Sequence, residues 1–251
     1  MADTAGRQMG LPLYAVLKGK TMNIMSLLNA LPGAVAQGLI WGIMAIGVYI
    51  TFRILDFADL TVDGSLCTGG AVCIMLMLSG QNVWVSMAGA TAAGMAAGLA
   101  TGILHTFMGI PAILAGILTQ LGLYSINLKT MGKANQAINV DKYDLLVSLR
   151  FIRKVPFYRN TILMVAITII ILIAVLYWFF GTELGCSLRA TGCNDKMARA
   201  QGINTDLSRV LGLMISNGLV ALSGAMLCQY QGFADINMGR GAIVIGLAAV
   251  I

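Results

Sequence analysis

Five side chains that could take part in transport chemistry lie beside long apolar stretches of this sequence. They are Asp56, Asp59, Asp63, Asp235 and Asn237. An unpaired carboxylate at the centre of a membrane helix costs about 2.5 to 3.5 kcal/mol, so it faces a cavity or a partner group. We expect these residues to line or gate a translocation path. The alternative is that they cap helix N-termini at the membrane surface, and for Asp63, just before Gly64, capping is favoured.

Other kinds of chemistry find little support in the sequence. The five cysteines contain no Cys-x-x-Cys pair and His105 is the only histidine, so no metal-ligand spacing is present. No nucleophile, base and orienting group are readable together, which excludes the common forms of covalent catalysis. We therefore expect neither an enzyme nor a bound metal or cofactor.

The composition shows which environment must hold these residues. Hydrophobic residues make up 58% of the 251 positions and charged residues only 10%, far below the roughly 25% of charged residues in soluble domains. The apolar stretches are continuous rather than alternating, which indicates helices in a bilayer. The net charge of +6 lies mostly beside apolar segments, so we expect lipid headgroups and not nucleic acid as its partner.

Apolar windows of about 20 residues predict about seven membrane crossings in an all-α polytopic protein. The predicted spans are 26–52, 64–79, 84–107, 110–131, 160–180 and 208–231, with a seventh opening at Gly241. We interpret residues 1–25 as an interfacial elbow and 26–251 as one transmembrane domain. The last segment reaches Ile251 after only eleven residues, so we expect the sequence to stop short of one or more helices.

A short repeat suggests how the domain is organised. Phe-Ala-Asp occurs at 57–59 and again at 233–235, each time shortly before an apolar helix. Five predicted crossings separate the copies, and an odd number places them on opposite sides of the membrane. This arrangement is typical of inverted repeats with discontinuous helices, in which the substrate route lies between the halves.

Glycines recur at helical spacing in two of the predicted spans. Gly94, Gly98 and Gly102 share one helix face, as do Gly38 and Gly42. Such spacing lets helix backbones approach closely. Packing within the chain is the favoured interpretation, and a dimer interface is the alternative.

The polar segment 181–209 contains the signals of a short surface helix. Asn194 is a good N-cap, Asp195 complements the helix dipole, Ala198 favours helix and Gly202 can end it in a left-handed turn. The segment is either an ordinary connection between two spans or a helix that docks into a partner.

Two motifs in this segment make the second interpretation specific. They read Thr182-x-Leu184-Gly185-x-x-Leu188-Arg189-Ala190 and Ala198-x-x-x-Gly202-Ile203. Together they resemble the cytoplasmic coupling-loop signature of the branched-chain amino acid permease family of ABC importers. The regions 38–70 and 219–251 are similar to two further conserved blocks of that family, and the sequence looks closest to the tryptophan or tyrosine uptake subgroup.

The resemblance implies a multi-pass permease of the bacterial inner membrane, working as a homodimer or heterodimer. Two cytoplasmic ATPase subunits would bind the ATP, and an extracytoplasmic solute-binding protein would deliver a hydrophobic or aromatic amino acid. The residues implied to couple the permease to the ATPase are Arg189, Ala190, Asn194, Asp195, Ala198, Gly202 and Ile203.

Two rival classes remain open. An ion-coupled secondary transporter suits inverted repeats and buried acids equally well, but it needs no docking helix. A structural membrane protein would place neither Asp59 nor Asp235 on a cavity. One charge pattern also opposes the resemblance: the segment 129–159 holds seven Lys or Arg and 181–209 holds four, so the positive-inside rule alone would put the former in the cytoplasm.

Overall fold

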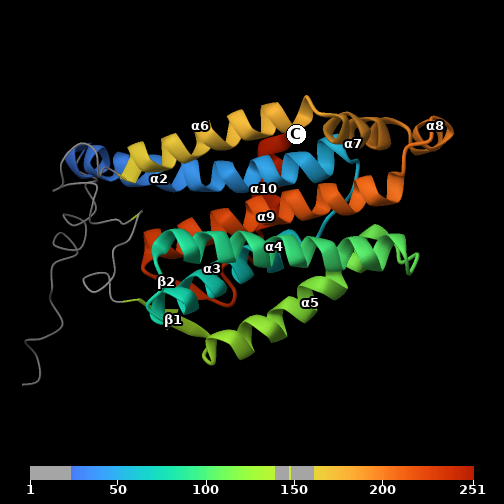
Figure 1. The fold of residues 1–251 in the computed structure, drawn as a ribbon. Coiled ribbons are helices and arrows are strands. Elements are labelled where there is room, and N and C mark those ends of the chain that lie inside the picture. The colour runs from blue at the N-terminus through green and yellow to red at the C-terminus, as the bar shows by residue number, and fades with distance from the viewer. Residues whose placement is uncertain (1–23, 139–146, 148–160) are drawn as a thin grey trace, which may run out of the picture.

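The computed structural model describes residues 24–138, 147 and 161–251, and its elements form one bundle of roughly aligned helices (Figure 1). Residues 1–23 of the predicted elbow and most of the basic loop after Met131 lie outside these residues, and positions 24 and 25 of the elbow begin α2. The elements are α2 Ile24–Tyr49, the π-helical turn η1 Ile50–Ile54, α3 Val62–Leu78, α4 Val83–Thr106, α5 Ala112–Met131, β1 Asn135–Ala137, α6 Thr161–Phe180, α7 Glu183–Cys193, α8 Asp195–Ala200, α9 Thr205–Gln231, β2 Phe233–Asp235 and α10 Ala242–Val250.

Five of the helices are long and apolar enough to cross a membrane, with mean hydropathy between 1.2 and 2.9. The predicted helical, multi-pass membrane protein is confirmed in its main lines, and these five helices match predicted spans within a few residues. The other two predicted spans form shorter helices: α3 has 17 residues and α10 has 9. A 17-residue helix is about 26 Å long, less than the roughly 30 Å of a bilayer core.

The bundle is built around α9, whose most apolar window is 72% buried. A Cβ added at Gly94, Gly98 or Gly102 of α4 would collide with or press tightly against atoms of α9. The glycine face therefore packs within the chain, as the favoured interpretation predicts. A Cβ added at Gly38 or Gly42 would meet no atom within 4 Å. These two glycines of α2 therefore do not mark a close helix contact within the described chain.

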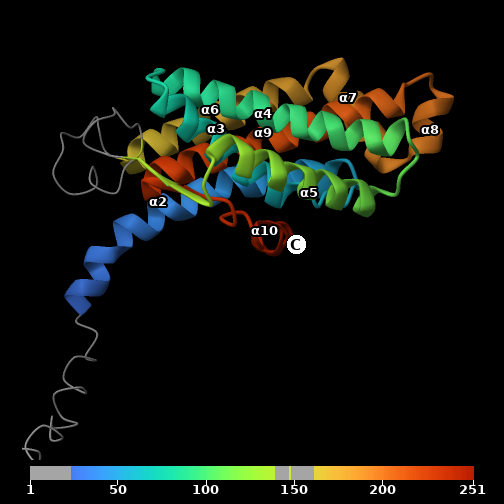
Figure 2. The same cartoon turned by 90° about the horizontal axis from the view of Figure 1, so that it is seen from below.

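The helix α6 lies on the outside of the bundle beside α2 (Figures 1 and 2). Its most apolar window has a mean hydropathy of 2.9 and is only 11% buried. Its outward side chains include Ile170, Ile171 and Val175. An apolar helix that stays exposed in a folded chain is what lipid as a solvent selects.

The two ends of the bundle differ. At one end, here called the α8 end, lie α7, α8 and the connection between α4 and α5 (Figure 1). At the other, the sheet end, β1 pairs antiparallel with β2, with Asn135 opposite Asp235 and Ala137 opposite Phe233. This small sheet is an addition to the predicted all-α fold.

The copies of Phe-Ala-Asp lie at different levels of the bundle. The backbone of Ile54, just before the first copy, lies against Gly192 of α7 near the α8 end, while the second copy forms β2 at the sheet end. The odd number of crossings predicts such a separation. The first copy is irregular and the second is a strand, so the inverted repeat itself stays a prediction.

Candidate functional site

The short helix α8 has the caps that the sequence predicts. The Asn194 side chain accepts a hydrogen bond from the Met197 N–H at 3.1 Å, which satisfies one of the free amides at the helix start. At the other end Gly202 has a φ of +82°, the left-handed conformation that glycine adopts at low cost. The predicted N-cap and the predicted left-handed turn are both confirmed.

Charged side chains fasten α8 to the beginning of α9. The Asp195 carboxylate lies 3.3 Å from the Arg209 guanidinium and 3.5 Å from that of Arg199. Arg199 also donates to Asp206 at 3.0 Å and to Thr205 at 2.8 Å. Each exposed ion pair contributes little alone, but a network with fixed geometry holds an element in place. α8 is therefore presented in one orientation.

The side chains of α8 divide into an inner and an outer face. Ala198 is 3% exposed, so it packs against the protein and is not available to a partner. Met197 is 63% exposed and is an apolar residue at the tip of the bundle. A flexible, exposed methionine suits contact with a partner surface.

The remaining residues of the coupling signature lie on α7 and before α9. Arg189 is exposed and donates to the Phe180 carbonyl at 3.1 Å. Ala190 and Ile203 border a surface hollow of about 620 Å³. The sequence analysis did not predict α7 as a separate helix. Thr182 could have indicated its start: the Thr182 hydroxyl caps α7 by accepting from the Gly185 N–H at 3.4 Å.

Asp59 lies inside the bundle and both its oxygens are bonded. Its carboxylate accepts from the Thr61 N–H at 2.8 Å and from the Asn217 side-chain amide at 2.7 Å. Asn217 in turn accepts from the Ser65 hydroxyl at 2.6 Å and donates to the Leu213 carbonyl at 3.0 Å. Asp59 therefore fixes the irregular break before α3 to the middle of α9.

A small cavity borders Asp59 on its other side. It measures about 140 Å³, and most of its lining is apolar, including Val48, Ile113 and Leu247. The hydroxyls of Thr61, Thr101 and Thr119 form a second chain, at 2.8 and 3.0 Å, that links α3, α4 and α5. The sequence analysis missed these threonines.

The other candidate acids do not gather with Asp59. Asp56 is exposed, and its φ of +50° makes it the one non-glycine residue with a positive φ in the described chain. Asp235 lies at the sheet end, where its carboxylate accepts from the Asn237 N–H at 2.7 Å and shapes the turn after β2. The side chain of Asn237 is exposed. The five candidates thus occupy three separate places.

Asp63 joins two helices that begin at the middle of the bundle. It stands in the first turn of α3, and its carboxylate accepts from the backbone N–H groups of Gly241 and Ile243 at 3.1 and 2.9 Å. It therefore caps the start of α10. The favoured interpretation of Asp63 as a helix cap agrees with this contact, although the capped helix is 178 residues away and not its own.

The segment between β2 and α10 reaches this junction through a close backbone contact. A Cβ at Gly239 would collide with the Asp63 carbonyl, which explains the glycine. The Gly239 N–H donates to the Cys67 sulfur at 3.1 Å, and the Cys67 thiol donates to the Ile236 carbonyl at 3.2 Å. The starts of α3 and α10 therefore meet, as the starts of discontinuous helices do in many transporter sites.

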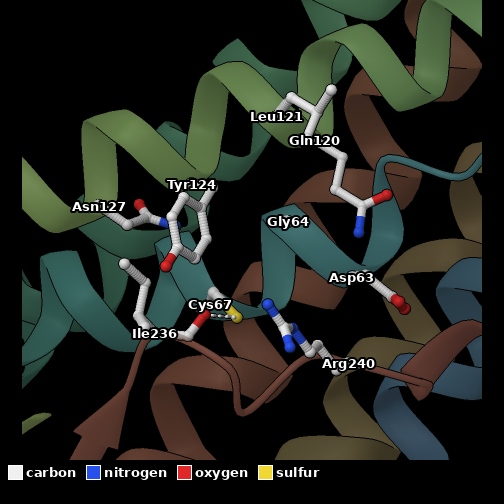
Figure 3. Close-up of a pocket in the computed structure, with 9 residues that line it drawn as sticks. All are labelled: Asp63, Gly64, Cys67, Gln120, Leu121, Tyr124, Asn127, Ile236 and Arg240. Carbon is white, nitrogen blue, oxygen red and sulfur yellow. Dashed lines mark hydrogen bonds between the residues drawn. The ribbon is translucent and has the colours of Figure 1, made fainter. Parts of the chain in front are cut away.

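A cavity of about 340 Å³ opens beside this junction (Figure 3). Its polar lining comes from α3, from α5 and from the segment before α10. These residues are Asp63, Cys67, Gln120, Tyr124, Asn127 and Arg240. Of these only Asp63 was a sequence candidate. The sequence pattern could have indicated the others on α5, since Gln120, Tyr124 and Asn127 repeat at helical spacing on one face of an apolar span.

Comparison with known proteins identifies the family. The profile described as branched-chain amino acid transport system / permease component matches residues 31–251. The tyrosine transport system permease protein of Clostridioides difficile (strain R20291) is 39% identical over 89% of this chain and 72% of its own length. An uncharacterized protein of Rickettsia prowazekii (strain Madrid E) is 36% identical over 89% of this chain and 76% of its own length.

A more distant relative is the autoinducer 2 import system permease protein LsrC of Yersinia pestis (strain Pestoides F). It is 31% identical over 83% of this chain, which spans 57% of that relative. No solved structure matches the chain. The chain belongs to the branched-chain amino acid transport permease family and is a permease component of an ABC-type importer of small solutes.

Proposed function

We propose that this permease carries an amino acid, hydrophobic or aromatic, into a bacterial cell, and that ATPase subunits drive it by contact with α8. The relative named for tyrosine transport supports an aromatic substrate. LsrC is named for a different solute, so the family accommodates more than one substrate class. ATP is bound by the partner, and this chain provides the path.

The observation that carries the proposal is the form of α8. A capped helix of six residues projects at one end of the bundle, held by Asp195 and Arg199, with Met197 facing outward. A force applied to a loosely held loop would be lost in its movement. A force applied to α8 passes through Arg209 and Asp206 directly into the central helix α9.

The proposal also assigns sides and partners. The α8 end faces the cytoplasm and the sheet end faces outward, toward a solute-binding protein. A second permease subunit, a copy of this chain or a related one, completes the path. Asp59 and Asp63 act at the break and the junction along that path, while Asp56, Asp235 and Asn237 act at its two ends.

The ion-coupled alternative would give Asp59 or Asp63 a different task. Such a carrier needs a carboxylate that takes up and releases a proton or cation. The oxygens of Asp59 accept from Asn217 and Thr61, and those of Asp63 accept from Gly241 and Ile243. These contacts favour a positioning role for both, and the family favours an external source of energy.

The test replaces the exposed methionine of α8. Met197→Glu places a charge on the outer face without disturbing the buried Ala198, so α8 stays folded. We expect ATPase subunits to copurify at least about tenfold less and uptake to fall in proportion, since a buried unpaired charge costs several kcal/mol at an interface. The measurements are copurification from membranes and uptake of labelled L-tyrosine.

Met108→Glu is the matched control. Met108 is also at the α8 end, in the connection between α4 and α5, and is 66% exposed against 63% for Met197. We expect this variant to behave as the wild type. Equal losses in both variants, or none in Met197→Glu, would show that α8 is not the docking element.

A further inference from the structure

The cavity of about 340 Å³ at the junction of α3 and α10 contains a cation that no carboxylate neutralises by contact. Arg240 lines the cavity and has no ion pair within the described part of the chain. In Figure 3 its guanidinium turns toward Cys67, whereas the Asp63 carboxylate turns away, toward the backbone of α10. Arg240 is itself exposed, so its guanidinium is open to an anion that enters the cavity.

The cavity opens on the α5 side of the bundle, where Leu121 and Tyr124 are exposed, and it lies near the middle of the bundle's length. A Cβ at Gly64, beside Asp63, would touch Gln120 and Leu123, which are central residues of α5. On the opposite side, Ser65 bonds Asn217, near the centre of α9. Arg240 is therefore placed at the depth where a solute in transit must pass.

A second group in the same cavity also lacks a partner. The Asn127 side chain is only 2% exposed, and its amide nitrogen has no hydrogen-bond partner among the residues described. A buried donor without an acceptor costs free energy, so such groups are usually satisfied by a ligand or water. Asn127 lies one helical turn from Tyr124 on the cavity wall (Figure 3).

We propose that this cavity binds the carboxylate group of the transported solute, with Arg240 as the counter-charge and Asn127 as a neutral donor. The inference rests on the proposed function, because the cavity must lie on the route of that solute. A guanidinium presents parallel N–H donors that match the two oxygens of a carboxylate. The volume is at the small end of the roughly 300 to 1,000 Å³ of small-molecule sites, which suits one small solute.

The experiment measures binding to the purified full chain in lipid nanodiscs, without ATPase subunits. The probes are tritiated L-tyrosine and L-leucine, and the competitors are unlabelled tyrosine and tyramine, which lacks the carboxylate. The variants are Arg240→Gln, Arg240→Lys and Asn127→Leu. Lys133→Gln is the matched control, because Lys133 is an exposed cation just after α5 and does not line the cavity.

We expect Arg240→Gln to weaken binding at least about tenfold and Asn127→Leu to weaken it severalfold, since hydrogen bonds to charged groups are the stronger ones. Arg240→Lys keeps the charge and should fall between Arg240→Gln and the wild type. Tyramine should not displace the probes. If a variant fails to fold, as size exclusion would reveal, the tyramine competition on the wild-type chain still decides.

Three results would overturn the inference: equal affinity in Arg240→Gln and Lys133→Gln, displacement by tyramine as strong as by tyrosine, or no saturable binding of either probe at millimolar concentration. The assay contains no ATPase, so its outcome is independent of docking at α8. A chain that binds tyrosine but recruits no ATPase contradicts the proposed function alone, and the reverse result contradicts this inference alone.

Discussion

At the scale of single residues, two aspartates four positions apart hold the chain breaks of the bundle in place. Asp59 fixes the segment before α3 to Asn217 of α9, and Asp63 caps α10. Each carboxylate accepts two N–H bonds; those of Asp59 are buried, whereas those of Asp63 lie at the partly exposed start of α10. Acids inside an apolar bundle are here satisfied by amides, which offsets the cost of their burial.

A prediction for Asp59 follows from these bonds. In Asp59→Asn one oxygen becomes an amide that faces the Asn217 amide, and Asn217 cannot turn because it also bonds Ser65 and Leu213. We expect a loss of about 2 kcal/mol of folding stability, the cost of leaving buried donors unpaired. The measurement is the thermal unfolding midpoint in mild detergent.

Asp56→Asn is the control for that experiment. Asp56 is exposed, and asparagine tolerates its left-handed backbone conformation. We expect its midpoint to equal that of the wild type. A midpoint unchanged in Asp59→Asn as well would mean that the Asn217 contact contributes nothing to stability.

The candidate acids could be found from the sequence because a charge in an apolar stretch is conspicuous. What each acid bonds could not be found, because Asp59 and Asn217 are 158 residues apart and Asp63 and Gly241 are 178 apart. The cavity residues were missed for a different reason. Gln120, Tyr124 and Asn127 are uncharged, so they are less conspicuous in an apolar span than an acid, and only their spacing on one helix face indicates a shared site.

At the scale of elements, small residues decide how closely the helices pack. A lipid solvent gives no hydrophobic force between helices, so association depends on close contact. The face of α4 that carries Gly94, Gly98 and Gly102 lies directly on α9. This close packing holds α4 and α9 together, and α9 is the helix that follows α8 in the chain.

Replacing one of these glycines tests that packing. In Gly98→Ala the new Cβ would collide with the Leu213 carbonyl of α9, a backbone atom that cannot move aside. We expect a loss of about 2 kcal/mol, typical of overpacked interfaces. The thermal midpoint in detergent measures it.

Gly42→Ala is the matched control, since a Cβ there meets open space in the same kind of helix. Its midpoint should stay at the wild-type value or rise slightly, because alanine favours helix. Equal midpoints in the two variants would contradict the close α4–α9 contact.

Most of the long helices could be predicted because a run of about twenty apolar residues forms a membrane-spanning helix. The helix α8 could be predicted from its capping residues Asn194 and Gly202. The short helices were harder. The start of α10 depends on Asp63, and β1 and β2 depend on each other across about a hundred residues. The sequence pattern records local preference and not these distant contacts.

At the scale of the whole molecule, we propose that energy enters at one end of the bundle and that the solute binds in the middle. In the proposed mechanism α8 receives the partner and α9 carries the movement inward. The junction of α3 and α10 lies beside Ser65, which bonds Asn217 of α9. The sequence alone left the sides open, because the basic segment 129–159 argues for the opposite orientation.

Two native exposed cysteines allow the orientation of the chain in the membrane to be tested without introducing a new cysteine. Cys186 and Cys193 are exposed on α7, and the other three cysteines are buried. The variant Cys186→Ser leaves Cys193, directly before Asn194, as the one exposed thiol of the described chain.

The most direct measurement is the labelling of this thiol by a membrane-impermeant maleimide in right-side-out and inverted membrane vesicles, with and without ATPase subunits. We expect labelling only in inverted vesicles and slower labelling when the ATPase is present. Labelling in right-side-out vesicles, or a rate that the ATPase does not change, would contradict the claim that energy enters through α8.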